Sequence, residues 1–323
     1  MDKIKNIGIE YLIWLYVTAC ASWLSLRLFD YGWQGWIVLV LAVVFAALVS
    51  LNKNNLGYRI LGQASIKARF WKYELAGVLL ITLVMAWVIV EVRPVEFLTQ
   101  AGNTQNILKG IFNPNPQELV PMLEALVETI FLALLATLFA IPFAFVLSFF
   151  AAKNLMFGSI WGRIVYVVIR LISTVFRSIE AIVWAIIFCV WVGIGPFAGM
   201  LALWVHSIAS LIKLYSEQIE NIDPGPVEAI RATGAGTLQI WRYAVTPQIL
   251  APYLAFTIYR WDINIRMATI VGFVGGGGIG LALYQQQQML AWRNVGLIMW
   301  LIAIVVWVMD MFSAHIRTKL IAN

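Results

Sequence analysis

Charged side chains are scarce in this sequence, and their scarcity excludes a soluble globular protein. Asp, Glu, Lys and Arg make up 12% of the 323 residues, whereas 62% of the residues are hydrophobic and the mean hydropathy is +0.86. A soluble domain could not bury so much apolar surface. Apolar runs close to the ~20 residues that cross a bilayer recur along the whole chain, so the composition predicts a polytopic, all-α membrane protein.

Cysteine and histidine are almost absent as well, which leaves little for a disulfide framework or a zinc site. Cys20 and Cys189 lie far apart in apolar segments, and His206 and His315 are isolated in the sequence. The chain also lacks the G-x-x-x-x-G-K-[ST] loop of nucleotide-binding subunits. We therefore expect no catalytic residue, metal or cofactor in this chain, and a membrane enzyme is the least favoured class.

Eight transmembrane helices are predicted from the apolar runs. They lie at about residues 8–28, 33–51, 74–92, 123–150, 163–192, 197–214, 250–274 and 295–312. The fifth would be about 45 Å long at 1.5 Å per residue, more than the ~30 Å hydrocarbon core. Because Arg163, Arg170 and Arg177 share one face of it, we expect its first turns to lie along the cytoplasmic interface. Pro142 should kink the fourth helix.

The apolar runs divide the chain into three expected parts. Residues 1–73 form a helical hairpin and a basic, aromatic segment that is either an interfacial helix or a plain positive loop. Residues 74–121 add one transmembrane helix and an extracytoplasmic loop. Residues 122–323 form the transmembrane core, which includes a cytoplasmic loop at residues 216–248.

The net charge of +6 indicates membrane topology and not nucleic-acid binding, because the Lys and Arg residues are spread between the apolar runs. With the N-terminus inside, most of the 22 Lys and Arg residues fall on the inner side. Four lie at the outer side: Arg27, Arg93, Lys109 and Arg293. The positive-inside rule therefore places both termini and the loop at residues 216–248 in the cytoplasm of an inner-membrane protein.

This cytoplasmic loop is a polar, helix-prone island between two long apolar runs. Asp223 supplies an N-cap and the prolines after it suit a helix start, so a short helix is predicted over residues 227–235, closed by one of two glycines. A second short helix is predicted over residues 237–244, stopping at Pro247. Two short helices at the membrane face would form a small, rigid protrusion from the cytoplasmic side.

The spacing Glu-Ala-x-x-x-x-Gly, followed thirteen residues later by Pro, resembles the cytoplasmic loop of type I ABC importer permeases. The residues in the matching places are Glu228, Ala229, Gly234 and Pro247. Residues 259–266 and 272–280 resemble the sixth-helix region of phosphonate and phosphite importer permeases. The resemblance covers about residues 123–320, and its mild departures from the loop pattern are Ile230, Ala244 and Thr246.

The resemblance implies a permease subunit that moves phosphonates, or a related small phosphorus oxyanion, across the cytoplasmic membrane by alternating access. Its implied partners are a second copy of the permease, two ABC ATPase subunits that bind ATP and Mg²⁺, and an extracytoplasmic phosphonate-binding protein. The loop at residues 216–248 would dock into a cleft on the ATPase. The alternatives are an ABC permease for another small solute, such as phosphite or an amino acid, and an ion-coupled secondary transporter.

Polar residues inside the seventh predicted helix are candidates for the translocation path. They are Arg260, Asp262, Asn264 and Arg266, and such residues should face the bundle interior, a partner or water. Asp262 and Arg266 are four residues apart and can form a structural pair. Alternatively, Arg266 and Asn264 line the path of an anionic phosphonate.

Two further stretches carry weaker expectations. Arg177 and Glu180 are three residues apart and are expected to pair, with a role in the path as the alternative. The sequence there departs from the family pattern, which has Pro and then an acidic residue after Ile179. The glycine-rich run at residues 275–280 lacks the Lys of a nucleotide loop and is expected to serve close packing or a hinge.

Overall fold

The computed structural model describes residues 11–20, 23 and 70–322, and these are helical with connecting turns and contain no strand. The predicted all-α fold is therefore confirmed. The second predicted span and the basic segment up to residue 69 lie outside the described residues. The chain divides into two compact units, Met1–Ala101 and Gly102–Asn323.

The first unit is described only in part. It contains the helix Tyr11–Cys20, α4 (Phe70–Ile89) and the short α5 (Pro94–Thr99), and the turn η1 (Gln100–Thr104) runs across its boundary. The hydroxyls of Tyr16 and Thr82 are 3.0 Å apart, which joins the first helix to α4. Both helices are apolar but too short in their apolar parts to pass as complete spans.

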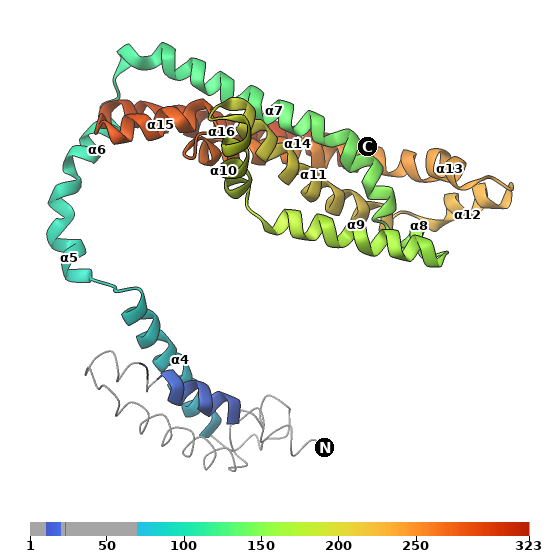
Figure 1. Ribbon diagram of the computed structural model, residues 1–323, viewed down its shortest axis with the longest axis horizontal. Coiled ribbons are helices and arrows are strands. Elements are labelled where there is room, and N and C mark those ends of the chain that lie inside the picture. The colour runs from blue at the N-terminus through green and yellow to red at the C-terminus, as the bar shows by residue number, and fades with distance from the viewer. Residues whose placement is uncertain (1–10, 21–22, 24–69, 323) are drawn as a thin grey trace. The chain divides into compact units, whose positions relative to one another are not determined.

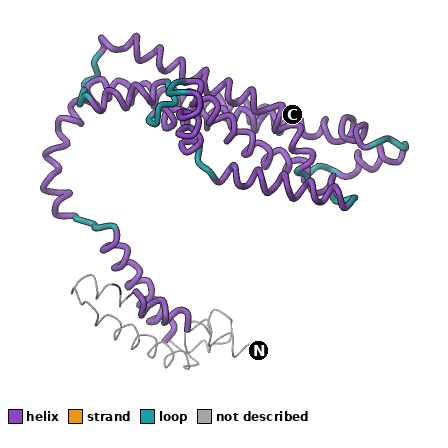
Figure 2. Tube along the Cα trace, in the orientation of Figure 1, coloured by secondary structure: helices purple, strands orange, loops and turns teal. Residues whose placement is uncertain are grey.

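The second unit is a bundle of long helices that run side by side (Figures 1 and 2). Its long members are α7 (Leu119–Phe150), α9 (Ile160–Ser178), α11 (Pro196–Glu220), α14 (Thr246–Gly272) and α16 (Trp292–Ala322). The shorter elements are α6 (Gln105–Phe112), η2 (Pro116–Glu118), α8 (Lys153–Met156), α10 (Ala181–Val192), α12 (Pro224–Ala232), α13 (Thr237–Ile240), the π-helical η3 (Trp241–Val245) and α15 (Gly278–Gln288).

Three of the described helices are long and apolar enough to cross a membrane: Pro116–Phe150, Pro196–Glu220 and Trp292–Leu320. The pair α9 and α10 would add a fourth if it is one bent span. Pro142 lies inside α7, which nevertheless continues as one helix. At 27 residues α14 is also long enough to cross, but Arg260, Asp262 and Arg266 interrupt its apolar sequence.

The predicted single helix over residues 163–192 is wrong, because the chain breaks at Ile179 and Glu180. Both residues have extended backbone angles, and α10 leaves α9 at 87°. The break is held against α11, since the carbonyl oxygen of Ile179 lies 3.2 Å from Nδ1 of His206. Beyond the break, α10 buries Ala181 and Ala185 in a core cluster shared with α11 and α14. Packing of these small residues therefore favours two helices.

The second short helix was predicted to stop at Pro247, and this prediction is also wrong. The helical path continues from α13 through one π-helical turn, η3, directly into α14. Pro247 lies in the first turn of α14, where its missing N–H group costs little. The hydroxyl of Thr246 donates to the carbonyl of Trp241 at 2.8 Å, which supplies a hydrogen bond across the widened turn.

The glycine-rich turn before α15 packs backbone against backbone, which confirms the close-packing interpretation. Gly275, Gly277 and Gly278 all have positive φ. The N–H of Gly195 donates to the carbonyl of Gly275 at 2.8 Å, and a Cβ added to Gly277 would lie 2.8 Å from Cα of Pro196. Residues with side chains would separate α11 from the start of α15 here.

Candidate functional site

The loop at residues 216–248, called the coupling loop below, is built around α12. The helix begins at Asp223, whose carboxylate oxygen accepts the N–H of Gly225 at 2.9 Å, and Pro224 occupies its first turn. It ends at Thr233, and Gly234 follows with φ of +81°. The predicted N-cap and the closing glycine are therefore confirmed, with Gly234 as the residue that reverses the chain.

One face of α12 is anchored in the bundle, and the other is presented outward. Val227 and the preceding Ile222 pack against the core cluster that contains Ile219 and Val245. Glu228 and Ala229 are exposed. Within the described part of the chain, Glu228 has no hydrogen bond or ion pair, so its carboxylate is free to bind a partner.

A residue that the sequence reasoning missed, Gln248, ties the two ends of the coupling loop together. Its side-chain oxygen accepts the N–H of Asp223 at 3.0 Å. Its amide nitrogen donates to the carbonyl of Asp223 at 3.3 Å and to that of Ala244 at 2.8 Å. No local signal could reveal this clamp, because 25 residues separate its partners.

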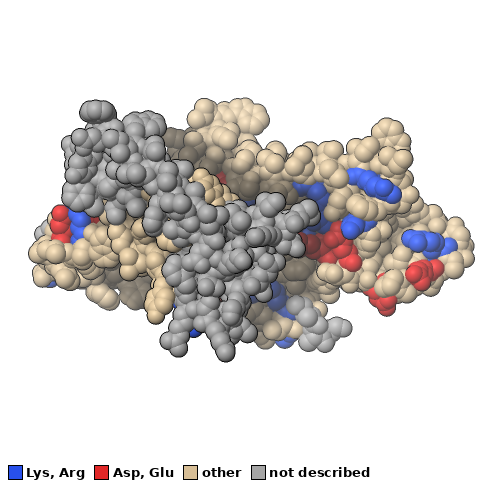
Figure 3. Space-filling view, turned by 90° about the horizontal axis from the view of Figure 1, so that it is seen from below, with Lys and Arg blue, Asp and Glu red and all other residues tan. Residues whose placement is uncertain are grey.

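The coupling loop lies at one end of the bundle, with α8 and the last turn of α11 (Figure 1). Charged side chains gather at this end, whereas uncharged surface predominates along the described flank of the bundle (Figure 3). This distribution fits a loop in water at the end of helices that lie in lipid.

The second candidate region is the middle of α14, residues 260–266, called the polar belt below. The predicted pair between Asp262 and Arg266 is confirmed, with a carboxylate-to-guanidinium distance of 2.7 Å. Arg266 also pairs with Asp310 of α16 at 3.0 Å, a contact that the sequence did not indicate. Two acidic groups therefore neutralise Arg266, whose side chain is 40% exposed while that of Asp262 is 3% exposed.

Arg260 and Asn264 lie inside the bundle, unlike the part-exposed Arg266. They are 5% and 0% exposed, and both contact the hydroxyl of Ser207 on α11, at 3.1 Å from Nε of Arg260 and 2.8 Å from Nδ2 of Asn264. Asn264 also donates to the hydroxyl of Thr137 on α7 at 2.9 Å. The polar belt thus joins three long helices through neutral hydroxyl groups.

Several polar atoms of the polar belt have no partner among the described residues. They include Nη2 of Arg260 and the side-chain oxygen of Asn264, together with Nε1 of the intervening Trp261. No Asp or Glu within those residues lies at ion-pair distance from Arg260. A buried cation without a counter-charge is costly, so this position is suited to an anion or to water.

The predicted pair between Arg177 and Glu180 does not form in the described structure. The 87° break explains this, because Arg177 lies in the last turn of α9 while Glu180 is the N-cap of α10, so the two side chains do not share a helix face. Both are exposed. The break itself contacts His206, whose neighbour Ser207 holds Arg260, so these two candidates lie near the polar belt.

Residues 144–320, more than half of the chain, match the family model described as "binding-protein-dependent transport system inner membrane component". The chain belongs to this family. The match includes the coupling loop and the polar belt, so both are parts of a permease of the ABC transporter class. Permeases of this class lie in the inner membrane with several spans, and they work with an ATPase and a substrate-binding protein.

Two relatives and one solved structure show how broad the similarity is. The permease is 35% identical over 59% of its length to a phosphite transport system permease protein of Stutzerimonas stutzeri, covering 68% of that protein. It is 42% identical over 38% of its length to a permease protein of a cryptic phosphonate transport system of Escherichia coli K12, covering all of it. Its fold matches an inward-facing conformation of the MetNI methionine ABC transporter with a TM-score of 0.54 and 24% identity, over 64% of this chain and 99% of that one.

Proposed function

We propose that this permease imports phosphonates or a closely related small phosphorus oxyanion by alternating access. It works as a homodimer with two ATPase subunits, which bind ATP and Mg²⁺, and receives substrate from an extracytoplasmic phosphonate-binding protein. The relatives with phosphite and phosphonate transport names support the substrate class. The observation that carries the mechanism is α12, a short helix capped at both ends that presents an unpaired carboxylate outward.

The coupling loop is the site where the ATPase acts. Glu228 and Ala229 form the contact surface, since both are exposed on the outward face of α12. Gly234 sets the chain reversal that gives α12 its end, and Pro247 begins the helix that continues to the polar belt. A rigid helix fixed to α11 on one side and to α14 on the other transmits a rigid-body movement to both.

Arg260 is the better candidate for the oxyanion contact than Arg266. Arg266 is already paired with two carboxylates, whereas Arg260 has a free guanidinium nitrogen and only a hydroxyl partner. Guanidinium groups bind phosphorus oxyanions through charge-assisted hydrogen bonds. In the resting bundle Arg260 is closed off, so the substrate reaches it only when α14 moves relative to α7 and α11.

We propose that the coupling loop faces the cytoplasm, where the ATPase would bind it, and that both chain termini lie on that side. The support is the distribution of Lys and Arg along the sequence. Lys109 and Arg293, which belong to the opposite end of the bundle, line a hollow of about 480 Å³ on the outer face.

The alternatives differ in what supports them. Phosphite as the main substrate stays within the same class of oxyanion, and the Stutzerimonas relative favours it. An amino acid has weaker support, from a methionine import permease that is 28% identical over 39% of this chain and from the methionine transporter's fold, a likeness of architecture. An ion-coupled secondary transporter would need Asp262 as a free carboxylate, but Asp262 is paired with Arg266.

The decisive experiment is uptake by the permease reconstituted in liposomes with its ATPase and binding protein. A phosphonate, phosphite, phosphate and methionine are offered in turn, with ATP present or depleted and with the proton gradient intact or collapsed. We expect uptake of a phosphorus oxyanion that requires ATP and survives collapse of the gradient. Uptake of methionine alone, or uptake that needs the gradient, would refute the proposal.

A further inference from the structure

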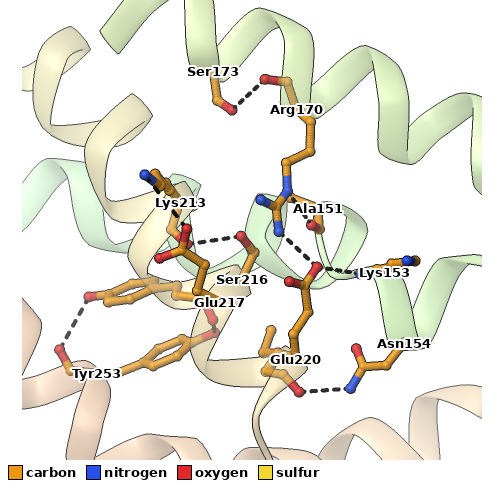
Figure 4. A network of polar contacts seen from close by, with 12 residues as sticks. Ala151, Lys153, Asn154, Arg170, Ser173, Lys213, Ser216, Glu217, Glu220 and Tyr253 are labelled. Atoms are coloured by element: carbon orange, nitrogen blue, oxygen red, sulfur yellow. Dashed lines mark hydrogen bonds and ion pairs between the residues drawn. The ribbon is translucent and has the colours of Figure 1, made fainter. Parts of the chain in front are cut away.

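The last turn of α11 carries a carboxylate that is bound from two directions (Figure 4). Oε1 of Glu220 accepts a hydrogen bond from Nη2 of Arg170, on α9, at 2.7 Å. The same oxygen accepts the backbone N–H of Lys153, at the start of α8, at 2.8 Å. Glu220, at the end of α11, is therefore connected both to α8 and to α9, which precede it in the chain by more than 40 residues.

Two further hydrogen bonds close this arrangement. Nε of Arg170 donates to the carbonyl of Ala151, just after α7, at 2.9 Å, and the side-chain amide of Asn154 donates to the carbonyl of Ile219 at 2.7 Å. Figure 4 shows these groups converging between the helices. We call this set, which consists of Ala151, Lys153, Asn154, Arg170 and Glu220, the Glu220 joint.

The Glu220 joint differs from an ordinary surface ion pair. Its two charged side chains are 26% and 27% exposed, and each makes an additional hydrogen bond to the backbone. One turn earlier on α11, Lys213 and Glu217 form a longer pair of 3.7 Å whose side chains are 41% and 43% exposed. Exposed pairs of that kind contribute little, whereas a part-buried carboxylate with several donors holds a fixed geometry.

The position of the joint gives it a mechanical role. Glu220 lies three residues before Asp223, the N-cap of α12, so it moves with the coupling loop. The loop is covalently continuous with α11 and α14, whereas α9 only packs against α11, with Ile169 on the core cluster that contains Leu211 and Ile212. Arg170 adds a polar link from α9 to the end of α11, about 12 Å along α9 from Ser178, where the break toward α10 begins.

We propose that the Glu220 joint transmits the movement of the coupling loop to α9 and, through it, to the α9–α10 break beside His206. Glu220 and Arg170 are positioning residues that bind neither ATP nor substrate. This inference rests on the proposed function, since it assumes that an ATPase moves α12. Without the joint, α12 and α11 move while α9 lags, and hydrolysis no longer opens the path.

The test compares Glu220→Gln with Glu217→Gln, a matched change one turn earlier on the same helix. The glutamine at position 220 keeps an oxygen for the N–H of Lys153 but loses the charge that holds Arg170. Both variants are reconstituted with the ATPase and the binding protein, and substrate imported per ATP hydrolysed is measured. We expect this ratio to fall about five- to tenfold for Glu220→Gln and to stay at the parent value for Glu217→Gln.

A charge exchange separates transmission from mere folding. The double variant Glu220→Arg with Arg170→Glu restores the ion pair with reversed polarity but not the hydrogen bonds to the N–H of Lys153 and the carbonyl of Ala151. We therefore expect it to recover part of the coupling that Glu220→Arg alone loses. If Glu220→Gln does not assemble, Arg170→Lys takes its place, because it keeps the charge and loses the planar fork that reaches Ala151 and Glu220 together. An unchanged import ratio in the assembled variant, or no recovery in the exchange, would overturn the proposal.

A second readout keeps this test independent of the substrate. We also measure how far the binding protein stimulates ATP hydrolysis by the complex, because any such stimulation must pass through the permease whatever the solute is. We expect Glu220→Gln to weaken the stimulation while basal hydrolysis is kept. If the parent complex imports no phosphorus oxyanion, the proposed function fails. The ATPase stimulation, compared between the parent and Glu220→Gln, still tests the Glu220 joint. If the parent imports the oxyanion and Glu220→Gln retains full stimulation and import, only the joint fails.

Discussion

The coupling loop and the polar belt are both polar regions in a largely apolar bundle, and they satisfy their polar groups in opposite ways. In the coupling loop, the caps of α12 come from residues two or three positions away, and the free carboxylate of Glu228 is exposed. In the polar belt, the partners of Asn264 come from helices 57 and 127 residues away, and several buried atoms have none among the described residues.

The difference agrees with the two tasks that we propose for these regions. A surface that receives force from another subunit must be rigid and accessible at rest, so local capping and exposure suit it. A site that a solute reaches only during transport must be closed at rest, and polar atoms left over in the closed state are then available for the solute. The predictions below test whether the two regions separate in this way.

The largest effect is expected for Glu228→Ala. Glu228 is exposed and forms no hydrogen bond or ion pair with the described residues, so its loss should leave the permease folded but remove the charge offered to the ATPase. Uptake should fall about tenfold or more. A change of this size corresponds to the usual coupling free energy between two sites. The measurement is ATP-driven uptake together with ATPase activity, and Glu217→Ala is the control for an exposed acid on the neighbouring helix. Normal uptake would place the docking surface elsewhere.

The next effect distinguishes the two arginines of the polar belt. Arg260→Gln should raise the KM of the complex for the transported oxyanion about tenfold, since a hydrogen bond to a charged group contributes about 1.5–3 kcal/mol. Arg266→Gln should change it by less than about threefold, because Arg266 is already neutralised by Asp262 and Asp310. Size-exclusion profiles in detergent check assembly, and Arg260→Lys serves if the glutamine variant is unstable. If Arg266→Gln raises the KM more than Arg260→Gln does, the anion contact lies at Arg266.

Contacts between near neighbours in the sequence were predicted in both regions, whereas contacts between distant helices were missed. The N-cap Asp223, the closing Gly234 and the pair of Asp262 with Arg266 all depend on residues within a few positions, and periodicity or cap rules describe such neighbours. The second partner of Arg266, Asp310, lies 44 positions away. Its position depends on how α14 packs against α16, which no local pattern encodes.

The two wrong helix boundaries have the same origin. Nothing in the sequence at Ile179 and Glu180 breaks a helix, since neither Gly nor Pro occurs there, and the break follows from the contact with His206 and the burial of Ala181. Conversely, Pro247 indicates a stop by rule, yet the π-helical turn before it lets the helix continue. In both places, packing between distant helices overrides the local preference.

A smaller effect, confined to the coupling loop, is expected for Gly234→Ala. A Cβ at Gly234 would meet no atom within 4 Å, so the cost arises only from its φ of +81° and amounts to about 1–2 kcal/mol. Gly236→Ala is the control, because φ there is −71°. Hydrogen exchange of the α12 amides should accelerate about 5- to 30-fold in the first variant and stay at the parent rate in the second. Equal rates would mean that Gly234 does not set the end of α12.

The smallest effect is expected for Gln248→Leu, which removes the clamp but leaves both caps of α12 in place. Its hydrogen bonds lie near the surface, so water replaces them and the net loss is about 1 kcal/mol. Hydrogen exchange at the amide of Asp223, which donates to Gln248, should accelerate about fivefold, while amides at the end of α12 keep the parent rate. Gln248→Glu keeps the acceptor and should restore protection at Asp223, but its carboxylate would repel the carbonyl oxygens of Asp223 and Ala244. If neither substitution changes exchange at Asp223, the two ends of the coupling loop are held by α11 and α14 alone, and the loop owes its rigidity to the bundle.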